Sequence, residues 1–171
     1  MPETNLRATK LLAACAAASV AILAGAIAMQ YVFGKQPCAW CVLQRLIFVL
    51  IAVVCGLGAL LPRARGAQIA AALTADALAT AGAAAALYLH FVASQSDSCG
   101  LSLADKVIMA LSLHETVPWM FFADAPCNEG NPVVLGVPFA LWSFSGFAVV
   151  GAGAVMALVL LLRQGRGRLG A

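Results

Sequence analysis

Charge is scarce in this sequence. Of its 171 residues 10% are charged, and 10 lysines and arginines against 7 acids leave a net charge of +3. So small an excess does not suggest a nucleic-acid partner. Because 63% of the residues are hydrophobic, a soluble domain of this length could not cover its apolar surface. The composition therefore excludes an ordinary soluble protein and places the chain in a bilayer.

The sequence also lacks the motifs of a metal, flavin or nucleotide site. What it has instead is six cysteines, whose meaning depends on the side of the membrane that each one occupies. They are Cys15, Cys38, Cys41, Cys55, Cys99 and Cys127.

Uncharged apolar stretches of membrane-spanning length occur four times. A helix rises 1.5 Å per residue, so about 20 residues cross a hydrocarbon core of about 30 Å. We expect spans at about residues 11–33, 42–61, 74–94 and 138–162. The predicted fold class is an all-α integral membrane four-helix bundle, a single domain over residues 1–171 with outer loops 34–41 and 95–137.

A cleavable signal peptide is the alternative for the first span, but its apolar run exceeds the usual signal core of 7–15 residues.

The second outer loop carries a pattern typical of a short helix. Ser102 and Asp105 have the spacing of a capping box. Apolar residues follow at i, i+3, i+4 and i+7 and form one stripe: Ala104, Val107, Ile108 and Leu111. With the aromatic residues Trp119, Phe121 and Phe122, this favours an amphipathic interfacial helix. A helix that packs only on protein is the alternative.

The expected topology sorts the cysteines. Cys38 and Cys41 form a Cys-x-x-Cys in the first outer loop, and Cys99 and Cys127 lie in the second. The remaining two, Cys15 and Cys55, fall in the inner halves of spans one and two, where a cysteine usually acts as a small hydrophobic residue. Four thiols therefore share one side of the membrane, and this favours thiol–disulfide chemistry.

Cys41 is placed to react. It lies at or near the N-terminus of the second span, where unpaired backbone N–H groups stabilise an anion such as a thiolate. Arg45 follows four residues later, one helical turn along the same face, and its guanidinium favours the thiolate further. Snorkelling to the surface is the alternative role for Arg45.

Two other uses of these cysteines stay open from the residues alone. The four outer thiols could bind structural zinc, but Cys99 and Cys127 do not form a second Cys-x-x-Cys. Purely structural disulfides would brace the loops but leave the position of Arg45 unexplained.

His90, near the outer end of span three, is a candidate for a polar pocket, or it simply meets interfacial water. Asp76 is either an intramembrane acid or lies just before its helix begins.

The residues 36–45, Gln-Pro-Cys-Ala-Trp-Cys-Val-Leu-Gln-Arg, resemble the signature of the bacterial disulfide bond formation protein B (DsbB) family. Cys99-Gly100, Pro126-Cys127 and the stretch 135–142 resemble the rest of its pattern. The resemblance covers nearly the whole chain.

What the resemblance implies is a quinone-dependent protein-disulfide oxidoreductase of the bacterial inner membrane, the role of this family in the periplasm. Its partners would be a periplasmic DsbA-like thiol oxidase and a membrane quinone, with ubiquinone favoured over menaquinone. Cys99 would form the mixed disulfide with the partner, and Cys127 would then pair with Cys38. Cys41 would reduce the quinone, Arg45 would hold a quinone oxygen, and His90 would be a weaker neighbour of the ring.

Two other functions are alternatives. A vitamin K epoxide reductase-like protein also combines a Cys-x-x-Cys with a second cysteine pair, but in that family the loop pair comes first, and here the order is reversed. The other is a non-catalytic four-span scaffold whose disulfides only brace the loops. Reduction of Cys41 by a thioredoxin-like protein, followed by reoxidation by quinone, would distinguish the enzyme from the scaffold.

The distribution of positive charge predicts the orientation. Seven of the ten lysines and arginines fall on the side of the two termini: Arg7, Lys10, Arg63, Arg65, Arg163, Arg166 and Arg168. Lys35, Arg45 and Lys106 fall on the other side. Because positive charge is retained in the cytoplasm, both termini should be cytoplasmic and the cysteine-bearing loops periplasmic.

We expect a reporter that is active only in the periplasm to give no signal when fused at position 170 and a strong signal when fused near Ser96. The opposite pattern would put the outer cysteines in a reducing compartment and contradict the redox interpretation.

Overall fold

The computed structural model describes residues 3–95 and 102–169, with side chains over 6–95 and 102–163. Its long helices are α1 (Glu3–Val32), α2 (Ala39–Leu60), α3 (Arg65–Phe91) and α7 (Phe139–Leu169). Within the described residues four helices are long and apolar enough to cross a membrane. The predicted all-α membrane bundle is confirmed.

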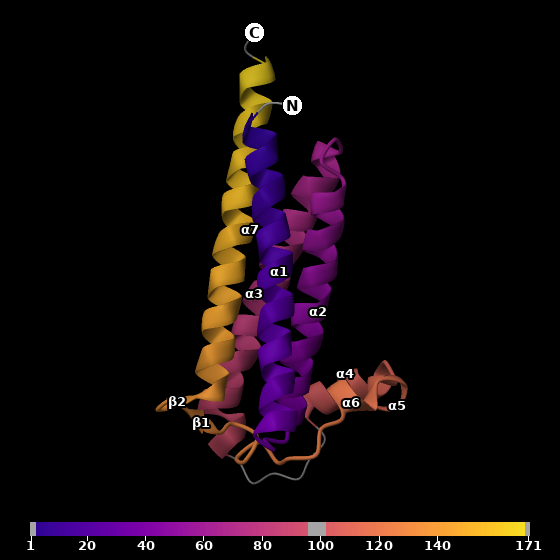
Figure 1. Ribbon diagram of the computed structural model, residues 1–171, viewed down its shortest axis with the longest axis vertical. Coiled ribbons are helices and arrows are strands. Elements are labelled where there is room, and N and C mark those ends of the chain that lie inside the picture. Colours follow the sequence, from indigo (N-terminus) through magenta and orange to yellow (C-terminus); the bar gives the residue numbers. More distant parts are fainter. Residues whose placement is uncertain (1–2, 96–101, 170–171) are drawn as a thin grey trace.

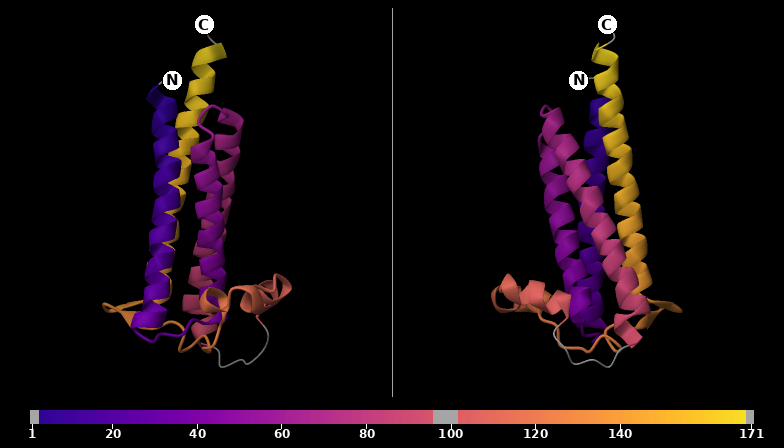
Figure 2. Two further views of the ribbon diagram at one scale, coloured as in Figure 1. Left: turned by 45° about the vertical axis from the view of Figure 1, so that its right-hand side comes forward. Right: turned by 180° about the vertical axis from the view of Figure 1, so that it is seen from behind.

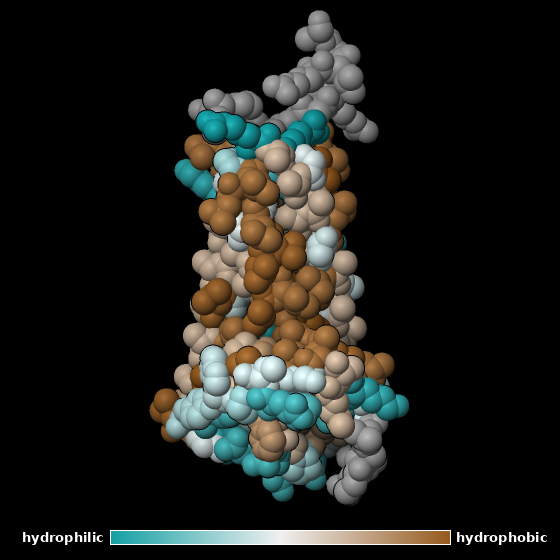
Figure 3. All heavy atoms as spheres, turned by 90° about the vertical axis from the view of Figure 1, so that its right-hand side faces the viewer, coloured by the Kyte–Doolittle hydropathy of each residue, from teal (hydrophilic) through white to brown (hydrophobic). Residues whose placement is uncertain are grey.

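The long helices stand side by side, and both termini lie at the same end of the bundle as the short α2–α3 turn (Figure 1). We call this the terminal end. The α1–α2 connection and the described part of the α3–α7 connection lie at the opposite, loop end (Figure 1). Apolar residues cover the middle of the face seen in Figure 3, and hydrophilic residues gather toward its two ends. This is the surface that a bilayer requires of a spanning protein.

Residues next to each helix end determine where α1 and α2 begin and end. α1 stops before Gly34, which has a left-handed φ of +64°, and the N–H of Lys35 closes the end by donating to the Met29 carbonyl over 3.2 Å. α2 begins after Cys38, whose backbone is extended, and ends before Pro62, which lacks the N–H that would continue a helix. Cys41 therefore lies in the first turn of α2.

The four long helices form a ring in which α1 packs on α2, α2 on α3, α3 on α7 and α7 on α1. At its centre the rings of Phe48 and Phe147 stack with centroids 3.9 Å apart. Gly82 of α3 lies directly against Phe147, since a Cβ built there would be 2.3 Å from the ring. Small residues of this kind let membrane helices approach closely.

The α3–α7 connection forms an arm of three short helices at the side of the bundle (Figure 2). They are α4 (Leu103–Ala110), α5 (Leu113–Thr116) and α6 (Pro118–Phe121), preceded by a 3-10 turn at Ala93–Gln95. The predicted capping box is confirmed, because Ser102 and Asp105 bond reciprocally. Ala104 and Ile108 of the stripe pack against α2, whereas Leu111 is exposed. A position in the membrane interface remains a prediction for this arm.

A small antiparallel hairpin precedes α7, and the sequence did not predict it. β1 (Val133–Val134) pairs with β2 (Val137–Pro138). Leu135 and Gly136 form the two-residue turn with φ of 52° and 81°, as hairpin turns of the primed type require. The indole N–H of Trp142 donates to the Val134 carbonyl over 3.1 Å and fixes the hairpin to the start of α7.

Gly82→Ala should destabilise the bundle. The new methyl group would collide with Phe147, which is 1% exposed and held by its stack on Phe48, so the ring has little room to move. Overpacking of this kind costs about 1–3 kcal/mol. We expect a lower midpoint of thermal unfolding in detergent. Gly56→Ala is the matched control, because no atom lies within 4 Å of its added Cβ, and its midpoint should not fall. Equal midpoints for the two variants would contradict this account of the core.

Candidate active site

One face of the first turns of α2 gathers the candidate site residues. Cys41, Gln44, Arg45 and Phe48 follow one another at i, i+3, i+4 and i+7, so the helical period puts them on the same side. All four are buried. The sequence thus aligns a thiol, an amide, a guanidinium and an aromatic ring along about two turns of helix.

Three sulfurs gather at the start of α2. The Cys38 thiol donates to the Cys41 sulfur over 3.3 Å, and the Cys41 thiol donates to the Gly130 carbonyl over 3.2 Å. Cys127 packs in the same cluster and hydrogen-bonds to Cys38. All three are free thiols in this structure. A dithiol and a third thiol from the other loop are therefore in mutual contact, the arrangement that disulfide exchange needs.

The second loop reaches the first by close backbone contact. The N–H groups of Asp124 and Ala125 donate to the Pro37 carbonyl over 3.2 and 3.3 Å. A Cβ on Gly130 would lie 2.5 Å from the Cβ of Cys38 and 2.9 Å from its backbone nitrogen. Only glycine fits there, so Gly130 is what lets the two loops meet at the sulfurs.

The surroundings keep two of the three sulfurs protonated. For Cys38, the hydrogen bond with Cys127 lowers the thiol pKa, but the bond with Cys41 and burial outweigh it and raise the pKa to about 12. The hydrogen bond with Cys38, aided by burial, raises the pKa of Cys127. In the dithiol form both are therefore poor nucleophiles at neutral pH, because the thiolate is the reactive species.

Arg45 is a buried cation held only by neutral groups. Its side chain is 5% exposed. Nη1 donates to the Gln30 Oε1 over 2.7 Å and to the Met120 carbonyl over 2.9 Å, and Nη2 donates to the Ala26 carbonyl over 3.2 Å. Among the described residues, no carboxylate forms a salt bridge with it. The uncompensated charge therefore favours an anion, or a polarisable oxygen, next to it.

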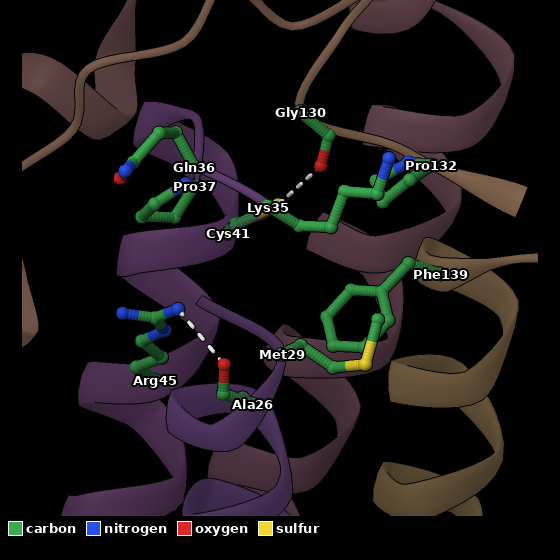
Figure 4. Close-up of a pocket in the computed structure, with 10 residues that line it drawn as sticks. All are labelled: Ala26, Met29, Lys35, Gln36, Pro37, Cys41, Arg45, Gly130, Pro132 and Phe139. Atoms are coloured by element: carbon green, nitrogen blue, oxygen red, sulfur yellow. Dashed lines mark hydrogen bonds between the residues drawn. The ribbon is translucent and has the colours of Figure 1, made fainter. Parts of the chain in front are cut away.

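Two neighbouring cavities open beside Cys41 and Arg45. The larger, of about 370 Å³, lies between α1, α2 and α7 and is lined mainly by apolar side chains. Ala26, Met29 and Phe139 are shared with the smaller cavity, of about 20 Å³, which reaches up to Lys35 and Gly130. Figure 4 shows Cys41 and Arg45 on the α2 side of this space, with Met29 and Phe139 facing them. We call the larger space the α1–α7 cavity.

The hairpin forms the lip of the α1–α7 cavity. Its lining includes Val134, Leu135 and Trp142. Leu135 is 88% exposed, and its backbone has a positive φ. A non-glycine residue in this conformation is uncommon. The lip therefore presents an apolar side chain to its surroundings at the mouth of the cavity.

The structure brings together Cys38, Cys41, Cys127 and Arg45, four of the residues selected from the sequence. Cys99 lies outside the described residues. His90 lies on α3 and is not among the residues that line either cavity; its ring packs edge-on against Phe91 at 4.7 Å. The inner cysteines, Cys15 and Cys55, are buried in the apolar core.

Sequence reasoning missed Gln44, Gln30 and Gly130. Gln44 was detectable, since it lies at i+3 from Cys41 on the reactive face. The roles of Gln30 and Gly130 depend on contacts across 15 and 89 residues of chain, and local spacing carries no signal for either.

Comparison with known proteins shows the family to which the chain belongs. The sequence profile of the family described as "Disulfide bond formation protein DsbB" matches residues 8–157. A disulfide bond formation protein B of Burkholderia pseudomallei is 33% identical over 163 residues, which are 95% of this chain and 94% of the relative. Disulfide bond formation protein B 1 of Pseudomonas savastanoi is 31% identical over 147 residues, which are 86% of this chain and 85% of the relative.

A further relative, disulfide bond formation protein B 1 of Pseudomonas fluorescens, is 34% identical and covers 76% of this chain and 77% of its own length. No solved structure matches the chain. With four helices able to span a membrane, this chain belongs to the DsbB family and is a multi-pass membrane oxidoreductase of disulfide bond formation.

Proposed function

We propose that this protein reoxidises a soluble periplasmic DsbA-like dithiol oxidase and passes the electrons to a membrane quinone, with the loop end periplasmic. The observation that carries the proposal is the position of Cys41 between the thiol cluster and the α1–α7 cavity. This one sulfur contacts the thiol cluster on one side and lines the apolar α1–α7 cavity on the other. It thus lies between the thiols that would exchange and a space that suits a lipid-soluble acceptor.

The residues of the α1–α7 cavity fit a quinone headgroup. Its volume of about 370 Å³ falls in the range of about 300–1,000 Å³ that small-molecule sites occupy. Its walls are apolar, and its polar groups include the Arg45 guanidinium and the buried Gln44 amide. When bound, a quinone supplies a two-electron acceptor. Arg45 would hold a ring oxygen with a charge-assisted hydrogen bond.

The thiol chemistry proceeds by exchange. In the oxidised protein Cys99 would be bonded to Cys127, and Cys38 to Cys41. A partner thiolate attacks Cys99, forms the mixed disulfide and displaces the Cys127 sulfur. Cys127 then attacks Cys38 and displaces Cys41 as a thiolate. The second partner thiol attacks the partner's own sulfur in the mixed disulfide, leaves the partner oxidised and frees Cys99.

Restoring the two disulfides removes two electrons and two protons from this chain. Cys99 attacks Cys127, re-forms the Cys99–Cys127 bond and releases Cys38 as a thiolate. Cys38 and Cys41 then form their disulfide, and the two electrons and two protons that they lose would pass to a quinone held in the α1–α7 cavity. Arg45 would stabilise negative charge there throughout, since a guanidinium stays protonated. The close approach at Gly130 supports the exchange by holding Cys127 against Cys38.

The outer and inner cysteines should differ in their effect on turnover. We expect Cys38→Ala, Cys41→Ala, Cys99→Ala and Cys127→Ala each to abolish quinone-dependent oxidation of a reduced thioredoxin-like donor. The double variant Cys15→Ala/Cys55→Ala should turn over near the wild-type rate, because both thiols lie in the apolar core. A dead double variant together with an active Cys38→Ala would contradict the assignment.

Arg45 should control quinone affinity more than thiol exchange. Arg45→Met removes a charge-assisted hydrogen bond worth about 1.5–3 kcal/mol, so the apparent quinone KM should rise roughly tenfold to a hundredfold. Arg45→Lys keeps the charge without the planar fork and should be intermediate.

The midpoint of thermal unfolding, measured in the same samples, reports whether each Arg45 variant is folded. Thiol exchange with the soluble partner should be largely retained in Arg45→Lys and weakened in Arg45→Met, which also loses the charge that favours the Cys41 thiolate. The matched control is Arg65→Met, which removes a half-buried arginine that donates to the Leu161 carbonyl far from the site. An unchanged KM in Arg45→Met at limiting quinone would mean that Arg45 is only an anchor.

A further inference from the structure

Gln44 is a buried amide whose hydrogen bonds are incomplete. Its side chain is 3% exposed, and within the described residues its Nε2 has no hydrogen-bond partner. Buried amide groups are nearly always paired, because an unpaired donor loses its bonds to water and gains nothing in return. Such a group in a native fold needs a physical explanation.

The position of Gln44 distinguishes it from the other buried polar atoms left without a partner. Those belong to Gln68, His90 and His114. The amide nitrogen of Gln68 has a partner, since it donates to the Thr9 hydroxyl over 2.8 Å, and Gln68 does not line the cavity beside Cys41 and Arg45. Gln44, in contrast, lines the α1–α7 cavity together with Cys41 and Arg45. Its missing partner is therefore to be sought in that cavity.

A water molecule alone would match only a small part of this cavity. Beside Gln44 the lining has the polar side chains of Cys41, Arg45 and Ser143, which could hold a water, but the rest of the wall is mainly apolar. A ligand that is apolar over most of its surface and carries an acceptor oxygen suits these walls better. Its acceptor would meet the amide donor while its ring and alkyl groups meet the side chains.

Two donors on adjacent residues set the geometry of such a ligand. Successive side chains on a helix are about 100° apart around its axis, so the Gln44 amide and the Arg45 guanidinium approach the cavity from different directions. One oxygen can accept two hydrogen bonds, but donors that approach from different directions do not readily converge on a single oxygen. A flat ring with oxygens on opposite edges offers an acceptor to each.

We propose that Gln44 is the second polar anchor of the quinone site and donates a hydrogen bond to the ring oxygen that Arg45 does not hold. This assignment rests on the proposed function and adds a selectivity to it: the site prefers ligands with two ring oxygens over ligands with one. Gln44 binds and orients the ring, and Cys41 and Arg45 carry the electron transfer and the charge.

The test uses full-length protein in detergent and two probes. One is a 1,4-benzoquinone with two methoxy groups and a decyl chain, and the other is a decyl phenol, which has a single ring oxygen. Binding is measured by quenching of tryptophan fluorescence, since Trp142 lines the cavity, with Trp142→Phe as the blank. The variants are Gln44→Leu and, as the matched control, Gln68→Leu.

We expect Gln44→Leu to weaken quinone binding roughly tenfold, the scale of one lost hydrogen bond to a ligand, and to leave phenol binding unchanged. Gln44→Glu, which lacks the NH2 donors, should not restore affinity, whereas Gln68→Leu should match the wild type. Thiol exchange with the soluble partner should be equal in all variants.

Three results would overturn the assignment. Wild-type quinone affinity in Gln44→Leu would mean that the amide does not touch the ligand. An equal loss for quinone and phenol, or the same loss in Gln68→Leu, would mean that Gln44 only supports the fold. If the wild-type protein does not bind the quinone and is not oxidised by it, the proposed function itself is contradicted, and the role of Gln44 as an anchor with it.

Discussion

The arrangement of the loop end depends on Arg45, a buried cation that forms no salt bridge within the part of the chain that the structure describes. Charges in a low-dielectric interior must be paired or solvated by dipoles, and the described structure solvates Arg45 with the carbonyls of Ala26 and Met120 and the amide oxygen of Gln30. These acceptors come from α1 and α6, so both elements must close on α2. The cation thus organises its neighbours and keeps an unmet preference for negative charge beside Cys41.

The arm belongs to the site through this contact. Met120 lies 75 residues from Arg45 in the chain, and the Tyr31 hydroxyl donates to the adjacent Trp119 carbonyl over 2.7 Å. Two carbonyls of α6 therefore fix the arm to α1 and α2. From this anchor the chain runs back across Pro37 and delivers Cys127 to Cys38. The contact that solvates Arg45 also helps to bring the third sulfur into the cluster.

The sequence predicts the parts of this structure that depend on local pattern. Uncharged runs predict the four spans, and the spacing of Ser102 and Asp105 predicts the start of α4. The common face of Cys41 and Arg45 follows from the helical period. What could not be predicted depends on long-range contact or on backbone strain. Leu135 occupies a turn position that normally favours glycine or asparagine, so the β hairpin had no clear signal, and nothing local pairs Gln30 with Arg45.

The aromatic stack separates the α1–α7 cavity from the centre of the bundle. Phe48 lines the cavity and stacks on Phe147, which is backed in turn by Gly82. Because close packing leaves this wall little freedom to move, its inner side is rigid. On the opposite side the lining includes Gly25, whose surroundings are open, and the exposed Leu135. The cavity is therefore closed toward the centre of the bundle and open toward its outer surface. Under the proposed function, a hydrophobic electron acceptor would reach Cys41 from that surface without crossing the helix bundle.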